Sequence, residues 1–154
     1  MGKIMANING SNNGRLKILV VDDDPSIVDI VTTFLDTEGY DVSSAVNGSA
    51  ALTLAKRINP DVVIIDIRMP EKDGLALTAE LKSFDSDIEV IVMTAFSDKD
   101  SILQALRLGV NDYLIKPFEL IELQSRINQL AEKYTIMRRD AKLRRDHAAL
   151  EFKN

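Results

Sequence analysis

Three consecutive carboxylates, Asp22, Asp23 and Asp24, follow directly on an apolar run in the stretch KILVVDDDPS, residues 17–26. Two like charges a few ångströms apart repel by about 4 kcal/mol at an effective dielectric constant near 20, so converging acids need a cation. Mg²⁺ is suitable because it takes oxygen ligands, usually one or two carboxylates with water and phosphate oxygens. Its charge also keeps those carboxylates ionised. The acidic run therefore predicts a magnesium site.

Polar side chains also close three later apolar runs. Asp66 ends DVVIID, Thr94 ends VIVMT and Lys116 ends YLIK. Ligands of an open parallel sheet bind outside the carboxyl ends of its strands, so these residues are expected at one edge. A lysine ammonium suits a carboxylate or phosphate, and a threonine hydroxyl can bond a phosphoryl oxygen. Metal, carboxylate, lysine and threonine together predict phosphoryl transfer, with Asp66 as the nucleophile.

The elements that position these residues alternate along the chain. Short apolar runs predict strands at 16–21, 41–45, 62–65, 90–93 and 113–115. Longer amphipathic runs predict helices from Pro25 to a stop at Gly39, and at 48–58, 74–83 and 98–108. All strands but the second are nearly continuously apolar, as strands covered on both faces are. This alternation predicts right-handed crossovers and a doubly wound α/β fold on a parallel sheet.

Composition sets the broad class of protein. The chain has 154 residues, one domain's length, and no cysteine, which excludes a disulfide framework and a thiolate metal site. It has neither a signal-peptide pattern nor an apolar stretch of about 20 residues, so a soluble, cytoplasmic protein is expected. The net charge of −5 is uneven: from Lys133 onward seven Lys/Arg face three Asp/Glu, a charge of +4, which leaves −9 on residues 1–132.

Four segments, VVDDDP, IIDIRMPEKDG, VMTAFSD and DYLIKPF, resemble in order and spacing the receiver domain of bacterial two-component response regulators. The resemblance covers about residues 16–130 and is closest in kind to the chemotaxis receivers. It implies a flavodoxin-like, five-stranded parallel sheet of order 2-1-3-4-5. It also implies a signalling phosphoacceptor rather than a turnover enzyme, one that promotes its own phosphorylation and dephosphorylation. The implied partner is a sensor histidine kinase or a phosphotransfer protein.

The resemblance implies a metal site built from four residues. Asp66 would accept the phosphoryl group, and Asp23, Asp66 and the backbone carbonyl of Arg68 would bind Mg²⁺ directly. Asp22 would assist through a water molecule. The side chains of Arg68 and Phe96, each two residues after a site residue, are expected to affect the access of attacking water.

The resemblance also implies a switch. Thr94 and Lys116 would contact the phosphoryl oxygens, and the Lys116–Pro117 peptide bond would be cis. Tyr113 would turn inward as Thr94 moves toward the phosphate. Phosphorylation would thereby change the surface formed by the fourth helix, 98–108, and the fifth strand, 113–115.

Other interpretations compete with this one. Asp24 is expected to cap the helix that begins at Pro25 rather than to bind metal. A metal-dependent phosphohydrolase of haloacid-dehalogenase type would use Asp22 as the nucleophile and Asp24 as the acid/base. That alternative leaves Asp66 unused, and no acidic metal-binding motif follows Lys116. A third interpretation, a metal-free interaction domain, is disfavoured because every residue needed for phosphorylation is present.

The sequence predicts three regions: a flexible leader at 1–15, a receiver domain at 16–132 and a helical extension or truncated linker at 133–154. The last helix starts near Glu119 and repeats apolar residues with 3,4 spacing as far as Ala141, where Arg144 then breaks the seam. This pattern predicts either a parallel dimeric coiled coil or a linker helix that docks elsewhere. The basic run from Arg138 is interrupted by acids, so no direct binding to nucleic acid or membrane is expected. No output domain is recognisable, and we expect a piece of a longer regulator rather than a stand-alone receiver.

Overall fold

The computed structural model describes residues 14–95 and 97–153, with the side chains of 138–141 and 149–153 left out. Most of the predicted leader, and Phe96, therefore lie outside the described residues. The chain divides into two compact units, one ending at Leu120 and the other beginning at Ile121, and each is described by itself. The predicted domain boundary between residues 132 and 133 stays a prediction.

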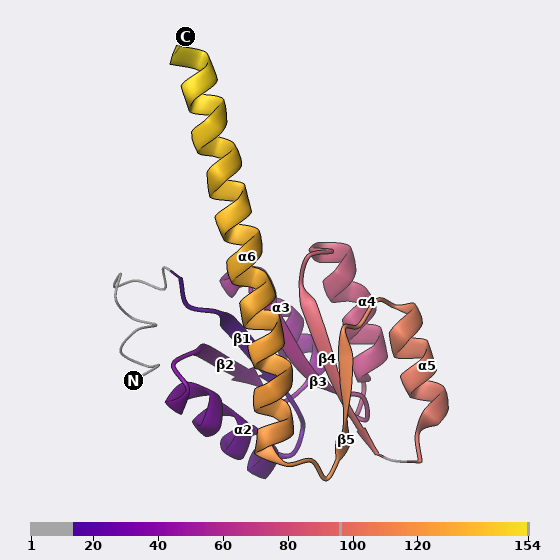
Figure 1. Ribbon diagram of the computed structural model, residues 1–154. Coiled ribbons are helices and arrows are strands. Elements are labelled where there is room, and N and C mark those ends of the chain that lie inside the picture. The colour runs from indigo at the N-terminus through magenta and orange to yellow at the C-terminus, as the bar shows by residue number, and fades with distance from the viewer. Residues whose placement is uncertain (1–13, 96, 154) are drawn as a thin grey trace. The chain divides into compact units, whose positions relative to one another are not determined.

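The first unit is built on a parallel sheet of five strands (Figure 1). The strands are β1 (Lys17–Val21), β2 (Asp41–Ala45), β3 (Val62–Asp66), β4 (Glu89–Ala95) and β5 (Asp112–Lys116). Their order, β2-β1-β3-β4-β5, confirms the predicted fold. The last three strands run further than predicted, because backbone pairing continues through Asp66, Ala95 and Lys116. Asp66, Thr94 and Lys116 are thus held within the sheet rather than after it.

Four helices connect these strands: α2 (Pro25–Thr37), α3 (Gly48–Ile58), α4 (Gly74–Phe84) and α5 (Lys99–Arg107). Side-chain caps fix where the first three begin. The carboxylate of Asp24 accepts from the Ser26 N–H at 2.9 Å, which confirms the predicted cap of α2. Asn47 and Asp73 cap α3 and α4 in the same way. A cap of this kind contributes about 1 kcal/mol.

Burial follows the apolar pattern of the strands. Every residue of β3 is buried, and so are four of the five residues of β1 and five of the seven of β4. Alternate residues of β1, β3 and β4 share one core with α3, α4 and α5. Val31 and Leu35 of α2, the helix that packs on β1 and β2, are buried separately from that core. The two edge strands, β2 and β5, are largely part-exposed, and the broken apolar pattern of β2 fits its place at the edge.

The second unit is the helix α6 (Leu120–Lys153), which has 34 residues. Ile136, Met137 and Leu143 on it are each more than half exposed. Among the described residues, no helix combines the length and the apolar character needed to cross a membrane. The expectation that its basic residues bind neither nucleic acid nor membrane stays a prediction.

Two glycines occupy equivalent helix starts but have different surroundings. Gly74 begins α4, and a Cβ there would collide with the backbone oxygen of Asp66 and come within 2.8 Å of the Ile67 Cα. Gly48 begins α3, and a Cβ there would meet only the flexible side chain of Lys72, at 2.9–3.0 Å. Close approach of α4 to the end of β3 therefore requires a glycine at position 74.

We expect Gly74→Ala to lower the free energy of unfolding by roughly 1–3 kcal/mol, because rigid backbone must move to admit the methyl group. The matched variant Gly48→Ala should change it by no more than about 0.5 kcal/mol, since the lysine chain can move aside. Urea denaturation of both variants measures the difference. Equal effects of the two substitutions would show that the approach of α4 to Asp66 is not tight.

Candidate functional site

The acidic residues of the first and third strands converge. Asp22, Asp23 and Asp66 each place one carboxylate oxygen within 4.8 Å of the others. Asp22 directly follows β1 and Asp66 ends β3, and these strands are neighbours in the sheet. Asp22 is fully buried, Asp66 is 6% exposed and Asp23 is exposed. The parallel sheet thus assembles the cluster as the apolar runs predicted.

Lys116 supplies a positive charge to this cluster from β5. Its Nζ lies 2.7 Å from Asp22 Oδ2 and 3.3 Å from Asp66 Oδ2. Burial lowers the pKa of Lys116, but the hydrogen bond that it donates to Asp22 and the charges of both carboxylates outweigh it and raise the pKa above its ordinary value. The ammonium is therefore held charged between two acids.

Asp66 is the carboxyl whose ionisation is most disturbed. Burial and the nearby charge of Asp22 raise its pKa from 3.8 to about 6. Lys116 and the Arg68 N–H, which donates to Asp66 Oδ1 at 3.2 Å, lower it without cancelling those effects. One ammonium is thus too little positive charge to keep the acids fully ionised. A divalent cation suits such a cluster, and its oxygen-only donors are those that Mg²⁺ prefers.

Thr94 lies beside Asp66 on the next strand. Asp66 pairs with Met93 in the register of β3 and β4, so Thr94 is one residue further toward the strand's carboxyl end. Thr94 is buried, and its hydroxyl is 3.5 Å from the carbonyl oxygen of Ala95, the outer limit of a hydrogen bond. Tyr113 on β5 is 38% exposed. The switch roles predicted for Thr94 and Tyr113 stay predictions.

A family model for the response regulator receiver domain matches residues 18–128. The chain belongs to this family. Among curated proteins, the chain is 43% identical over 117 residues to the probable transcriptional regulator ycf27 of Porphyridium aerugineum. The matched residues make up 76% of this chain and 48% of that protein. It is also 43% identical over 107 residues to the regulatory protein AtoC of Escherichia coli K12, covering 70% and 23%. The chain thus spans about half the length of the ycf27 protein, and less of AtoC.

Solved structures agree. The receiver domain of the Francisella response regulator 1452 superposes with a TM-score of 0.72 at 35% identity, covering 78% of this chain and 99% of that one. NtrX from Brucella abortus superposes with a TM-score of 0.76 at 29% identity, and the match covers 84% of this chain but 30% of that one. The family is one of signalling proteins, and this chain is a receiver domain.

These comparisons do not support the phosphohydrolase alternative, and the geometry explains why. That alternative needs Asp24 as an acid/base, but its carboxylate caps α2. Asp22, the nucleophile it requires, is fully buried and bonded to Lys116 and to the Asp24 N–H. The Lys116–Pro117 bond of the receiver is cis, as predicted.

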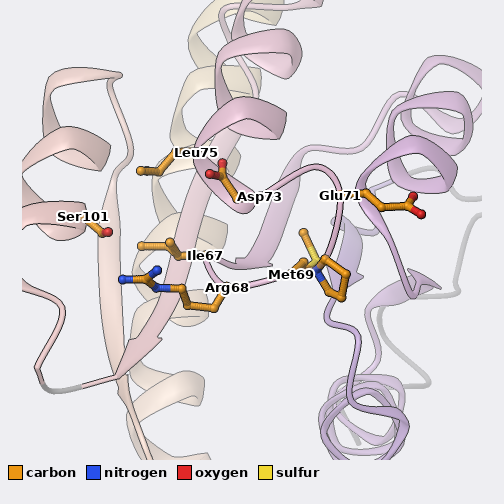
Figure 2. Close-up of a pocket in the computed structure, with 8 residues that line it drawn as sticks. Ile67, Arg68, Met69, Glu71, Asp73, Leu75 and Ser101 are labelled. Carbon is orange, nitrogen blue, oxygen red and sulfur yellow. The ribbon is translucent and has the colours of Figure 1, made fainter.

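A cavity of about 390 Å³ is lined mainly by the β3–α4 loop, which directly follows Asp66 (Figure 2). Its lining residues are Ile67, Arg68, Met69, Pro70, Glu71, Asp73, Leu75 and Ser101. One contact near this cavity was not expected from the sequence: Arg68 and Asp98 form an ion pair, with 2.8 Å between Arg68 Nε and Asp98 Oδ2 at the start of α5. The only sequence signal was an acid just before a helical pattern, which is typical of a cap.

Proposed function

We propose that Asp66 accepts a phosphoryl group from a phosphohistidine of a sensor histidine kinase or phosphotransfer protein, in a reaction that requires Mg²⁺. An Asp66 carboxylate oxygen forms a bond to phosphorus as the phosphorus–nitrogen bond of the donor breaks, and the product is an acyl phosphate. The observation that supports this most directly is the cluster of Asp22, Asp23 and Asp66 with the Lys116 ammonium in contact with two of them. Asp66 is the only one of the three acids that ends a strand.

Each neighbour of Asp66 has a part in this proposal. Asp22 and Asp23, with Asp66 and the carbonyl of Arg68, would hold Mg²⁺, which neutralises charge on the transferring phosphoryl group. Lys116 is placed to move from Asp66 to a phosphoryl oxygen, because its Nζ already lies 3.3 Å from the acceptor carboxylate. Thr94 would donate its hydroxyl proton to another phosphoryl oxygen.

The output would be a change of surface rather than a released product. Leu103 and Leu106 on α5 are 54% and 47% exposed, and Tyr113 on β5 is 38% exposed. We propose that phosphorylation draws Thr94 toward the phosphate and lets Tyr113 turn inward. This change shifts the equilibrium between two conformations of the α5–β5 surface. The receiver acts as a signalling phosphoacceptor that catalyses its own phosphorylation and dephosphorylation, in the cytoplasm where its kinase partner works.

Site mapping tests this proposal. The chain is incubated with acetyl phosphate and Mg²⁺, its intact mass is measured, and the modified residue is located by peptide analysis after reductive trapping. We expect one phosphoryl group per chain, on Asp66, and none when Mg²⁺ is chelated. A label on Asp22, or steady turnover of phosphomonoesters, would show that the proposal is wrong.

We also propose that the receiver domain spans residues 16–132 and that the helical extension, 133–154, forms a parallel homodimer. The support is the 3,4 repeat of apolar residues along α6, in which Met137 is 51% exposed. A second helix would bury this face in a coiled coil. Sedimentation equilibrium should then give twice the mass of one chain, and a monomer mass at micromolar concentration would contradict the dimer.

A further inference from the structure

An ion pair outside the acidic cluster links the acceptor loop to α5. Arg68 Nε is 2.8 Å from Asp98 Oδ2, and the two residues lie 30 positions apart in the sequence. The Arg68 side chain is 73% exposed, whereas that of Asp98 is only 8% exposed. The proposed phosphoryl transfer uses the backbone of Arg68 but gives no role to its guanidinium or to Asp98.

The same arginine also contacts the acceptor. Its backbone N–H donates to Asp66 Oδ1 at 3.2 Å, and its side chain extends from the β3–α4 loop toward the wall of the cavity that carries Ser101 of α5 (Figure 2). Asp98 is the residue immediately before α5, and its carboxylate interacts with Ser101 of that helix as well as with Arg68. One residue therefore connects the phosphorylation site with the start of the proposed output surface.

We propose that the Arg68–Asp98 ion pair is a latch that restrains the first turn of α5 in the unphosphorylated receiver, and that a phosphoryl group on Asp66 competes with Asp98 for the Arg68 guanidinium. The inference rests on the proposed function, since it requires Asp66 to be the acceptor.

The charges favour such a competition. A phosphoryl group carries a charge of about −1.5 to −2 and three acceptor oxygens, and a guanidinium binds it with two parallel hydrogen bonds. The Arg68 side chain is exposed and can turn toward the phosphoryl group at little cost, and Asp98 then keeps its interaction with Ser101 but loses its charged partner. The latch thus opposes the phosphorylated state until the phosphoryl charge outweighs it.

Two substitutions of aspartate by asparagine at the start of α5 test the latch. Asp98→Asn removes the charge that holds Arg68, and Asp100→Asn removes the same charge from an exposed position two residues along. The affinity of each for beryllofluoride, a mimic of the phosphoryl group, is measured in Mg²⁺ by titration calorimetry. We expect Asp98→Asn to bind about five-fold more tightly than wild type, and Asp100→Asn to bind as wild type does. Unchanged or weaker binding by Asp98→Asn overturns the latch.

A third variant distinguishes the restraint of α5 by the ion pair from the competition for the Arg68 guanidinium. Arg68→Gln breaks the ion pair but leaves no guanidinium for the phosphoryl group. Without beryllofluoride, both Asp98→Asn and Arg68→Gln should speed amide hydrogen exchange in the first turn of α5, and Asp100→Asn should not. Only Asp98→Asn should gain affinity; an equal gain in Arg68→Gln would overturn the competition. If wild type binds no beryllofluoride, the proposed function fails, while the exchange rates still decide whether the ion pair restrains α5.

Discussion

A receiver carrying Asp66→Asn takes up no phosphoryl group from acetyl phosphate under conditions that label the wild-type chain. The carboxamide is neither anionic nor nucleophilic, so the acyl phosphate cannot form, and we expect the labelling rate to fall by at least about 100-fold. Phosphorylation followed by intact mass over time measures the rate. The amide has the size and shape of the acid, so the buried site should stay folded.

The matched control is Asp24→Asn. Asp24 lies two residues after Asp22 and is exposed, and asparagine caps a helix as well as aspartate does. We expect this variant to be labelled at the wild-type rate. A loss of labelling in Asp24→Asn, with labelling retained in Asp66→Asn, would indicate that the acids after the first strand react. That result would favour the phosphohydrolase mechanism.

Asp66→Asn should also change how stability depends on pH. Burial and Asp22 raise the pKa of Asp66 from 3.8 to about 6 in the folded state. Between these values the folded chain binds more protons than the unfolded chain, so the free energy of unfolding falls as pH rises through this window. Allowing for partial solvent screening, the loss is on the order of 2 kcal/mol above the folded pKa.

Urea denaturation in a chelating buffer measures this effect. The wild-type free energy of unfolding should decline relative to that of Asp66→Asn between about pH 4 and pH 7, so that the variant is the more stable protein at neutral pH. Mg²⁺ should reduce the difference in free energy of unfolding between the two proteins at neutral pH, because a bound cation stabilises the ionised carboxylates of the wild type. Parallel pH profiles for the two proteins would show that Asp66 is not destabilised in its ionised form.

The fold and the cluster could be predicted because both follow from local patterns. Continuous apolar runs mark β1, β3 and β4 as buried strands, and parallel strands bring their carboxyl ends to one edge, which places Asp22 near Asp66. The extent of the strands could not be predicted from hydrophobicity, because Asp66 and Lys116 are polar. Pairing with neighbouring strands keeps these residues in the sheet.

Other features arise only when segments distant in the sequence pack together, so the hydrophobic periodicity of the sequence does not indicate them. Only the packing of α4 against β3 shows that a methyl group at Gly74 would strike the Asp66 carbonyl. Arg68 and Asp98 belong to different loops and to no apolar pattern, and their ion pair is visible only once the sheet brings those loops together. Sequence thus placed Asp66 in the acidic cluster, whereas the contact between Arg68 and Asp98 required the structure.

Lys116→Met should be the most destabilising charge substitution at the site. Methionine keeps the length and apolar stem of the side chain but leaves Asp22, which is fully buried, without the ammonium 2.7 Å away. Removing one partner of a buried ion pair costs about 3–5 kcal/mol, and because the Lys116 side chain is 25% exposed we expect about 3 kcal/mol in metal-free buffer. Urea denaturation measures it, with Lys99→Met as a control at an exposed position at the start of α5.

Adding Mg²⁺ makes this prediction specific to the cluster. A cation bound by Asp22, Asp23 and Asp66 replaces the missing positive charge, so Mg²⁺ should stabilise Lys116→Met by more than it stabilises the wild type or Lys99→Met. Equal stabilisation of all three proteins would mean that the cation and the lysine neutralise different carboxylates. The variant should still be labelled slowly or not at all, because Mg²⁺ restores the charge balance of the folded chain but not the ammonium that contacts Asp66. Stability and phosphorylation therefore respond differently to the same ion, which distinguishes the two tasks of Lys116.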